Sequence, residues 1–170
     1  MMPLPLSRIA QWTGGRLHGA DAPGLDQPGF DLLIDAVATD TRTLDASDGR
    51  AALYVALKGE RFDGHDHVVA AAEAGARAAL VSRPVEAPIP QVVVADTERA
   101  LAAFAAALQH TRSTRVAAIT GSNGKTSVKT LLLPILLRAA DAGEQGAYVN
   151  PGNRNNEIGL PLAVLDAPEQ

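Results

Sequence analysis

The chain has 170 residues, of which 46% are hydrophobic and 4% aromatic, and its 15 Lys and Arg residues against 19 Asp and Glu give a net charge of −4. Without a basic tract we expect no nucleic-acid binding by phosphate neutralisation, and without cysteine there is no disulfide framework or thiolate metal site. No stretch resembles a signal peptide or is long and apolar enough to cross a bilayer, which predicts a cytoplasmic protein without a membrane span.

The first two thirds of the chain alternate short apolar runs with helical patterns. We expect a helix at 8–13 capped by Ser7, and a second at 67–75 capped by Asp66. A third, alanine-rich helix is predicted at 97–110, because its large apolar residues share one face. The apolar runs predict buried strands at 32–38, 51–57, 78–81 and 91–94. Strands that alternate with helices argue an α/β layered fold.

A polar run at 110–115 predicts a domain boundary, with an N-terminal domain at 1–112 and the beginning of a second, doubly wound domain at 113–170. In the second domain we expect a strand at 116–119, a phosphate loop, and a helix from Thr126 that Pro134 kinks. Another strand is predicted at 145–149. Because such a domain needs more strands and a later carboxylate for Mg²⁺, the chain is interpreted as the N-terminal part of a longer enzyme.

The glycine-bounded loop before that helix carries the strongest functional signal. Two glycines let backbone N–H groups approach phosphate oxygens, and the helix directs its positive dipole end to the same point. Lys125 can reach the β- and γ-phosphates of a nucleotide, and the hydroxyl of Thr126 can ligate Mg²⁺. The competing interpretation is an ordinary turn, since Ile119 stands where the general pattern has glycine. The predicted ATP-binding residues are Gly121, Ser122, Asn123, Gly124, Lys125, Thr126 and Ser127.

Three other polar segments each have a structural and a functional interpretation. Residues 39–42 are either a strand-end turn with a solvated ion pair or part of a binding site. Residues 63–67 contain two histidines and two aspartates, but we favour a loop and helix cap over a metal site. The asparagines at 150–156 are either turn formers or amides that bind a peptide without adding charge.

Taken together, residues 39–42 with 53–66, the short phosphate loop and residues 152–161 resemble the Mur ligases of peptidoglycan synthesis. The asparagine run is most like that of the members that use D-alanyl-D-alanine. The resemblance covers about 6–165, accounts for Ile119 because the family's loop is short, and implies a UDP-sugar-binding domain before an ATP-binding one. It also implies these substrate-binding residues: Thr39, Asp40, Thr41, Arg42, Asn153, Asn155 and Asn156.

The resemblance implies ATP-dependent amide ligation with ATP and Mg²⁺ as cofactors. UDP-N-acetylmuramoyl-tripeptide and D-alanyl-D-alanine would be the substrates, and an acyl phosphate the intermediate. Lys125 would be catalytic, because its charge balances the transferred phosphoryl group. The alternatives are a diaminopimelate- or lysine-adding ligase, a folylpolyglutamate synthase, or a non-catalytic module that binds UDP-sugar or nucleotide.

Overall fold

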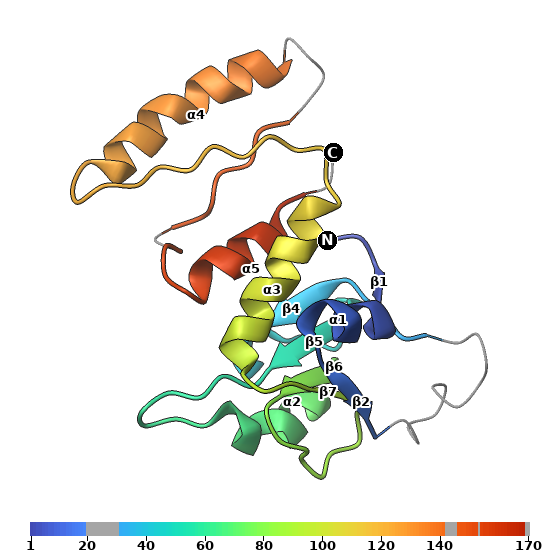
Figure 1. Ribbon diagram of the computed structural model, residues 1–170. Helices are drawn as coiled ribbons and strands as arrows, with labels where there is room; N and C mark the ends of the chain where they lie inside the picture. Colours follow the sequence, from blue (N-terminus) through green and yellow to red (C-terminus); the bar gives the residue numbers. More distant parts are fainter. Residues whose placement is uncertain (20–30, 142–145, 153, 169–170) are drawn as a thin grey trace.

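The computed structural model describes residues 1–19, 31–141, 146–152 and 154–168, which form an α/β body with one helix standing away from it (Figure 1). The elements in chain order are β1 (Leu4–Pro5), α1 (Leu6–Thr13), β2 (Arg16–His18), β3 (Leu33–Ile34), β4 (Ala36–Ala38), the 3-10 helix η1 (Thr41–Thr43), β5 (Ala52–Val55), the 3-10 helix η2 (Gly64–His67), α2 (Val68–Glu73), β6 (Ala76–Val81), β7 (Gln91–Val93), α3 (Thr97–His110), α4 (Lys125–Asp141) and α5 (Gly159–Asp166).

The body is built on a sheet with strand order β2-β7-β6-β5-β4. Strands β4, β5, β6 and β7 run parallel, and β2 pairs antiparallel with β7 at one edge. Parallel neighbours need crossover connections, which α2 supplies between β5 and β6. The α/β fold class that the sequence predicts is therefore confirmed.

Both faces of this sheet are buried, as expected for parallel strands. Along β5, Leu53 and Val55 point to one face and join a core with α1, α3 and α5. Tyr54, the residue between them, points to the other face, where it joins a smaller core with α2. All four residues of β5 are buried, which explains why this strand reads as an unbroken apolar run.

Helix α3 has the bounds that the sequence predicts. Asp96 caps it, because its carboxylate accepts hydrogen bonds from the amides of Glu98 and Arg99, both at 3.0 Å. Its apolar face places Phe104 and Leu108 in the larger core. The helix thus begins directly after its capping residue and extends over the run with helical apolar periodicity.

Two predicted helix caps are wrong. The helix at the N-terminus starts at Leu6, and the hydroxyl of Ser7 instead donates to the carboxylate of Asp31. Helix α2 begins at Val68, and its N-cap residue His67 makes no side-chain cap bond, so Asp66 does not cap it. Asp63 instead caps the preceding 3-10 helix η2, since its carboxylate accepts from the amide of His65 at 3.0 Å.

The predicted strand at 32–38 is two strands. β3 pairs with β1, whereas β4 pairs with β5 in the main sheet. Asp35 lies between them, and its carboxylate accepts from the amide of Ala51 at 2.9 Å. The chain thus changes sheets within one apolar run, which periodicity alone does not reveal.

The predicted strands at 116–119 and 145–149 are not observed. Residues 116–119 and 146–149 have no regular structure, and Val116 is 69% exposed. A strand exists only when a neighbour pairs with it, and within the described residues no strand lies beside either segment. Helix α4 continues through Pro134 as one helix.

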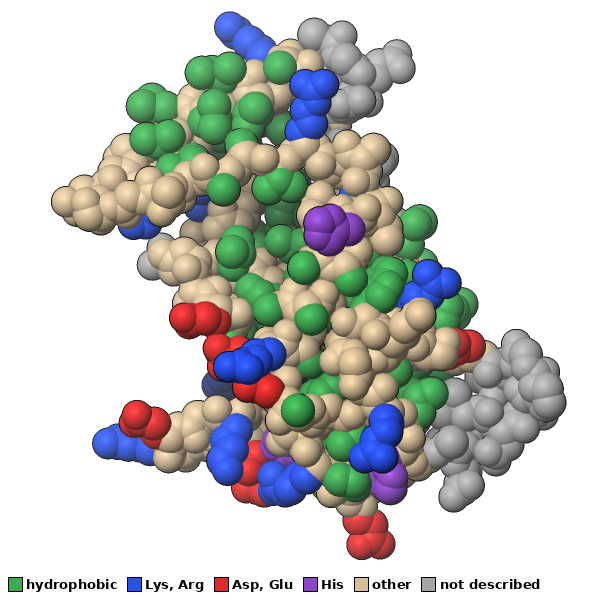
Figure 2. Space-filling model, viewed as in Figure 1, with side chains coloured by type: hydrophobic (Ala, Val, Ile, Leu, Met, Phe, Trp, Pro, Cys, Tyr) green, Lys and Arg blue, Asp and Glu red, His purple; other side chains and the backbone are tan. Residues whose placement is uncertain are grey.

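Helix α4 stands apart from the sheet, and apolar side chains gather on its surface (Figure 2). The large apolar residues exposed there are Val128, Leu131, Ile135, Leu136 and Leu137. Across the described part of the chain, no helix combines the length and apolar character that crossing a membrane requires.

Helix α5 returns to the body and packs along α3 (Figure 1). Leu165 is buried in the larger core, and Ile158 and Leu162 pack against it. The guanidinium of Arg112 donates to the carbonyl of Val164 at 2.8 Å and to that of Ala167 at 3.1 Å. Arg112 therefore ties the end of α3 to the last turn of α5.

We propose that the chain divides into units at 1–112 and 113–170, with α5 anchoring the second unit to the first. Residues 113–118 are exposed and lack regular structure, so this is where the linker lies. The anchor lies at the far end of the second unit, and the linker itself makes no part of it.

Limited trypsin digestion should therefore cut after Arg115 well before Arg112. Arg115 is exposed, whereas Arg112 is half-buried and bonded to two carbonyls of α5, so its peptide must first be released. Mass spectrometry of early fragments measures the order. First cuts after Arg77, inside β6, would contradict the proposed division.

Candidate functional site

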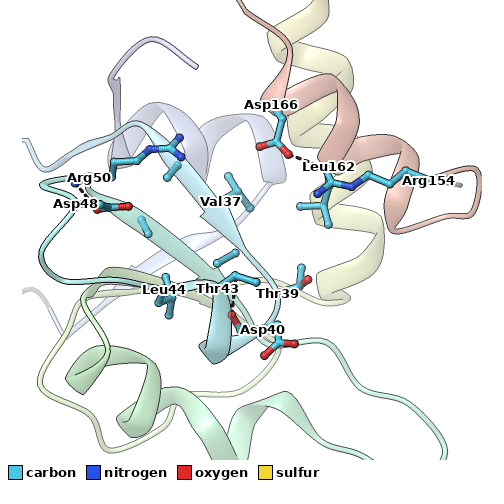
Figure 3. Close-up of a pocket in the computed structure, with 13 residues that line it drawn as sticks. Val37, Thr39, Asp40, Thr43, Leu44, Asp48, Arg50, Arg154, Leu162 and Asp166 are labelled. Carbon is cyan, nitrogen blue, oxygen red and sulfur yellow. Dashed lines mark hydrogen bonds and ion pairs between the residues drawn. The ribbon is translucent and has the colours of Figure 1, made fainter. Parts of the chain in front are cut away.

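A pocket of about 230 Å³ lies at the end of β4, between the main sheet and α5 (Figure 3). Thr39 and Asp40, two of the predicted substrate-binding residues, line it. Arg154 and Leu162 close it from the second unit. The remaining lining residues are Ala36, Val37, Ala38, Thr43, Leu44, Asp48, Arg50, Ala52 and Asp166.

The wall after β4 is ordered by Asp40. Its carboxylate accepts from the amide of Arg42 at 3.0 Å and pairs with the Arg42 guanidinium at 2.6 Å. Its carbonyl accepts from the hydroxyl of Thr43 at 2.7 Å. Hydrogen bonding to the Arg42 side chain is the main cause that lowers the pKa of Asp40 from 3.8 to about 2.

The predicted residues Thr41 and Arg42 lie in η1 and do not line the pocket. The side chain of Arg42 is 87% exposed, and its guanidinium donates hydrogen bonds to both carboxylate oxygens of Asp40. In this structure Arg42 braces the turn, which was one of its two interpretations.

The asparagine segment lies at the other side of the pocket, and of its predicted residues Asn153 lies outside the described residues. Asn156 accepts from the amide of Gly159 at 2.7 Å, so it caps the start of α5. A side chain at Gly159 would stand 2.9 Å from the backbone of Arg154, so the turn requires glycine there. Asn155 is exposed.

Arg154 joins this segment to α5. Its guanidinium pairs with the carboxylate of Asp166 at 2.5 Å, and both side chains are about 40% exposed. The pair forms part of the pocket rim in Figure 3. A guanidinium at the rim can bind an anion if Asp166 releases it.

The phosphate loop lies directly before α4, and Lys125 is the first residue of that helix. Gly121 and Gly124 have φ angles of +150° and +78°, which favour glycine, and a side chain at Gly124 would meet no other atom. These glycines are therefore required by backbone conformation rather than by crowding. Lys125 donates to the carbonyl of Gly121, so its ammonium lies across the loop.

The electrostatics of this loop suit an anion. The first turn of α4 contains no acidic residue, although acids are favoured at helix N-termini and lysines are not. The predicted residues Ser122, Asn123, Thr126 and Ser127 are exposed. A lysine at the N-terminus of α4 is unfavourable for the helix alone, but it becomes favourable once phosphate is bound there.

Residues 63–67 form a hydrogen-bonded network, not a metal site. His65 is buried, and its Nε2 accepts from the amide of Ser82 at 2.8 Å. The ring proton therefore lies on Nδ1 and is donated to Asp63 at 2.6 Å, so the ring is neutral. Bonds from the amide and then the ring of His65 lower the pKa of Asp63. Among the described residues, no cluster of potential ligands could hold a metal ion.

Several pocket residues escaped the sequence analysis. Arg50 and Asp48 lie in a turn before β5, and Asp166 is twelve positions from its partner Arg154, so no local motif marks them. Lys129, which lies outside the pocket, carried a usable signal, because it follows Lys125 by four residues and so shares its helix face.

Comparison with known proteins covers both units. Residues 34–111 match the Mur ligase family, catalytic domain, and residues 119–170 match the Mur ligase middle domain. The UDP-N-acetylmuramoyl-tripeptide–D-alanyl-D-alanine ligase of Escherichia coli is 41% identical over 165 residues, which are 97% of this chain and 32% of that protein. The chain thus spans about a third of the length of the curated relatives it matches.

Two solved structures of MurF also superpose on this chain. MurF from Acinetobacter baumannii superposes with a TM-score of 0.80 at 34% identity, covering 99% of this chain and 34% of that one. MurF ligase from Thermotoga maritima, solved in complex with ADP, superposes with a TM-score of 0.62 at 30% identity, covering 79% and 30%.

Replacing Arg42 by glutamine should raise the pKa of Asp40 from about 2 toward its ordinary 3.8, because the main cause of the shift is removed. Carboxyl-carbon NMR across a pH titration measures this. Since the folded pKa is the lower one, the stabilisation by the pair is present above about pH 4 and is lost as the pH falls toward 2.

The pKa of Asp45, which is lowered through Ser47, serves as the internal control and should not move in this variant. An unchanged Asp40 titration would show that Arg42 does not hold the carboxylate in solution.

Proposed function

This chain belongs to the Mur ligase family, and on that premise we propose that it is part of the ligase that joins D-alanyl-D-alanine to UDP-N-acetylmuramoyl-tripeptide. The names of the relatives over nearly the whole chain support this substrate pair. In the proposed reaction, ATP phosphorylates the tripeptide carboxylate, and the dipeptide amine displaces phosphate from the resulting acyl phosphate. Because the reaction consumes ATP, we expect it in the cytoplasm.

The observation that carries this proposal is the phosphate loop. Lys125 stands at the start of a helix without acidic residues in its first turn, and its ammonium bridges a glycine-bounded loop. To bind ATP, that ammonium would exchange the carbonyl of Gly121 for phosphate oxygens. It would then balance the negative charge that develops on the transferred phosphoryl group.

The loop also fits a magnesium ion, although it supplies few ligands. The hydroxyl of Thr126 is exposed one residue after Lys125 and is a hard oxygen donor of the kind Mg²⁺ accepts. When bound, the ion would neutralise phosphate charge. Thr126 is the single ligand proposed within this chain, and a later carboxylate, as the sequence analysis expects, would be a further protein ligand.

We propose that the pocket at the end of β4 receives one end of the muramoyl substrate. Its volume of about 230 Å³ is below the ~300–1,000 Å³ typical for a whole ligand, so it suits a part of a long one. Thr39 and Asp40 offer oxygen acceptors, and Thr39 also a hydroxyl donor. The amides of Asn155 and Asn156, from the other side, would meet the peptide.

In the complete enzyme, replacing Lys125 by alanine should lower turnover by about 10³-fold or more, the magnitude for loss of a key transition-state charge. Phosphate release that depends on both substrates measures turnover. Arg138→Ala is the matched control, because it removes a charge from the last turn of the same helix. Near-normal turnover without Lys125 would remove the phosphate loop from the mechanism.

The 170-residue chain alone should bind UDP-N-acetylmuramoyl-tripeptide weakly and hydrolyse no ATP. The pocket lies within it, whereas one hydroxyl is a poor Mg²⁺ site. Calorimetry tests the predicted weak binding of the substrate, and a phosphate-release assay tests the predicted absence of ATP hydrolysis. Binding of UDP-sugars without any preference for the tripeptide would favour a sensing module. Ligation of diaminopimelate or lysine by the complete enzyme, in place of D-alanyl-D-alanine, would favour a related ligase.

A further inference from the structure

Two lysines on one face of α4 contact two different loops. Lys125 and Lys129 are four residues apart, so their side chains lie one above the other. The first reaches the phosphate loop through the carbonyl of Gly121. The second is half-buried, and its ammonium donates to the carbonyls of Asn150 and Gly152, each at 3.1 Å.

Both contacts of Lys129 are to backbone, at the entrance of the segment 150–156. Asn150 is bonded twice, because its own side-chain amide also donates to the carbonyl of Arg154 at 3.0 Å. Gly152 has a φ angle of +55°, a left-handed conformation at the turn. These bonds hold the main chain at Asn150, Gly152 and Arg154 through backbone carbonyls, so they do not depend on the side chains at Gly152 and Arg154.

The other end of the segment is fixed independently. Asn156 caps α5, and Arg154 pairs with Asp166 on that helix. Helix α5 is in turn buried against α3. The segment therefore spans from α4, where Lys129 holds it, to the body of the first unit.

We propose that Lys129 is a positioning residue, which fixes the asparagine segment to the phosphate-loop helix and so sets Asn155 and Asn156 relative to Lys125. The inference rests on the proposed function, because it assigns to that alignment the placement of the muramoyl peptide beside the ATP phosphates. Lys129 touches neither substrate.

The charge of Lys129 supports a role beyond solubility. Like charges four residues apart on a helix repel, and the helix dipole disfavours both ammonium groups near its N-terminus. An exposed lysine would extend into water to reduce this cost. Lys129 instead turns to two carbonyls, which are strong acceptors for a charged donor.

The structural test compares Lys129→Met, Lys129→Arg and the control Arg138→Met in the 170-residue chain. Backbone order parameters of Gly152, Arg154 and Asn155, from ¹⁵N relaxation, should fall from about 0.8 to below about 0.6 in Lys129→Met. Lys129→Arg keeps a charged donor and should restore them, and Arg138→Met should leave them unchanged. Unaltered order in Lys129→Met overturns the proposal.

The functional test uses the same variants in the complete enzyme. Lys129→Met should raise the KM for the tripeptide substrate about tenfold, roughly the effect of one hydrogen bond to a charged group, with the KM for ATP nearly unchanged. Lys129→Arg should recover most of that loss. A loss confined to the KM for ATP, or a fall in turnover as large as that of Lys125→Ala, would make Lys129 a phosphate ligand and overturn the proposal.

Failure of the proposed function would look different. If the unaltered enzyme made no product from D-alanyl-D-alanine, the proposed ligation would be wrong, while the order parameters would still decide whether Lys129 holds the segment.

Discussion

The burial of α5 on α3 is the contact that fixes the C-terminal segment and the pocket wall to the sheet. Leu165 enters the same core as the central strands, and Arg112 binds two carbonyls at the end of α5. Residues 113–118 between the units are exposed and irregular, so they transmit little order. The second unit is therefore held to the first at its far end, by apolar burial completed by charged hydrogen bonds.

One consequence is that the pocket is lined both by the end of β4 and by the segment around α5. The end of β4 supplies Thr39 and Asp40, and the segment before α5 supplies Arg154. Asp40 pairs with Arg42 and Asp166 pairs with Arg154, so two of the three carboxylates that line the pocket are neutralised by separate arginines. The lining also contains Asp48 and Arg50, one charge of each sign, so the pocket has little net charge until a ligand displaces one of these pairs. A diphosphate would compete with Asp166 for the Arg154 guanidinium.

The phosphate loop, unlike the pocket, does not depend on the burial of a helix, since α4 is largely exposed. Much of the apolar surface of α4 is exposed, and lysines occupy its first two turns (Figure 2). Local backbone geometry, set by Gly121 and Gly124, is enough to shape the loop. Its anion preference comes from the helix dipole and Lys125, which need no surrounding core. This explains how a recognisable loop coexists with a helix that has few tertiary contacts.

The sequence by itself determined what depends on near neighbours: the alternation of strands and helices, the bounds of α3, and the glycine-lysine loop before α4. Tertiary structure decided the rest. Residues 116–119 have the composition of a strand but no partner beside them among the described residues, and the run at 32–38 changes sheets at Asp35. The contacts of Arg112 with α5, 52 and 55 positions away, and of Lys129 with Asn150, 21 away, arise only when packing brings distant carbonyls within reach, which no local periodicity encodes.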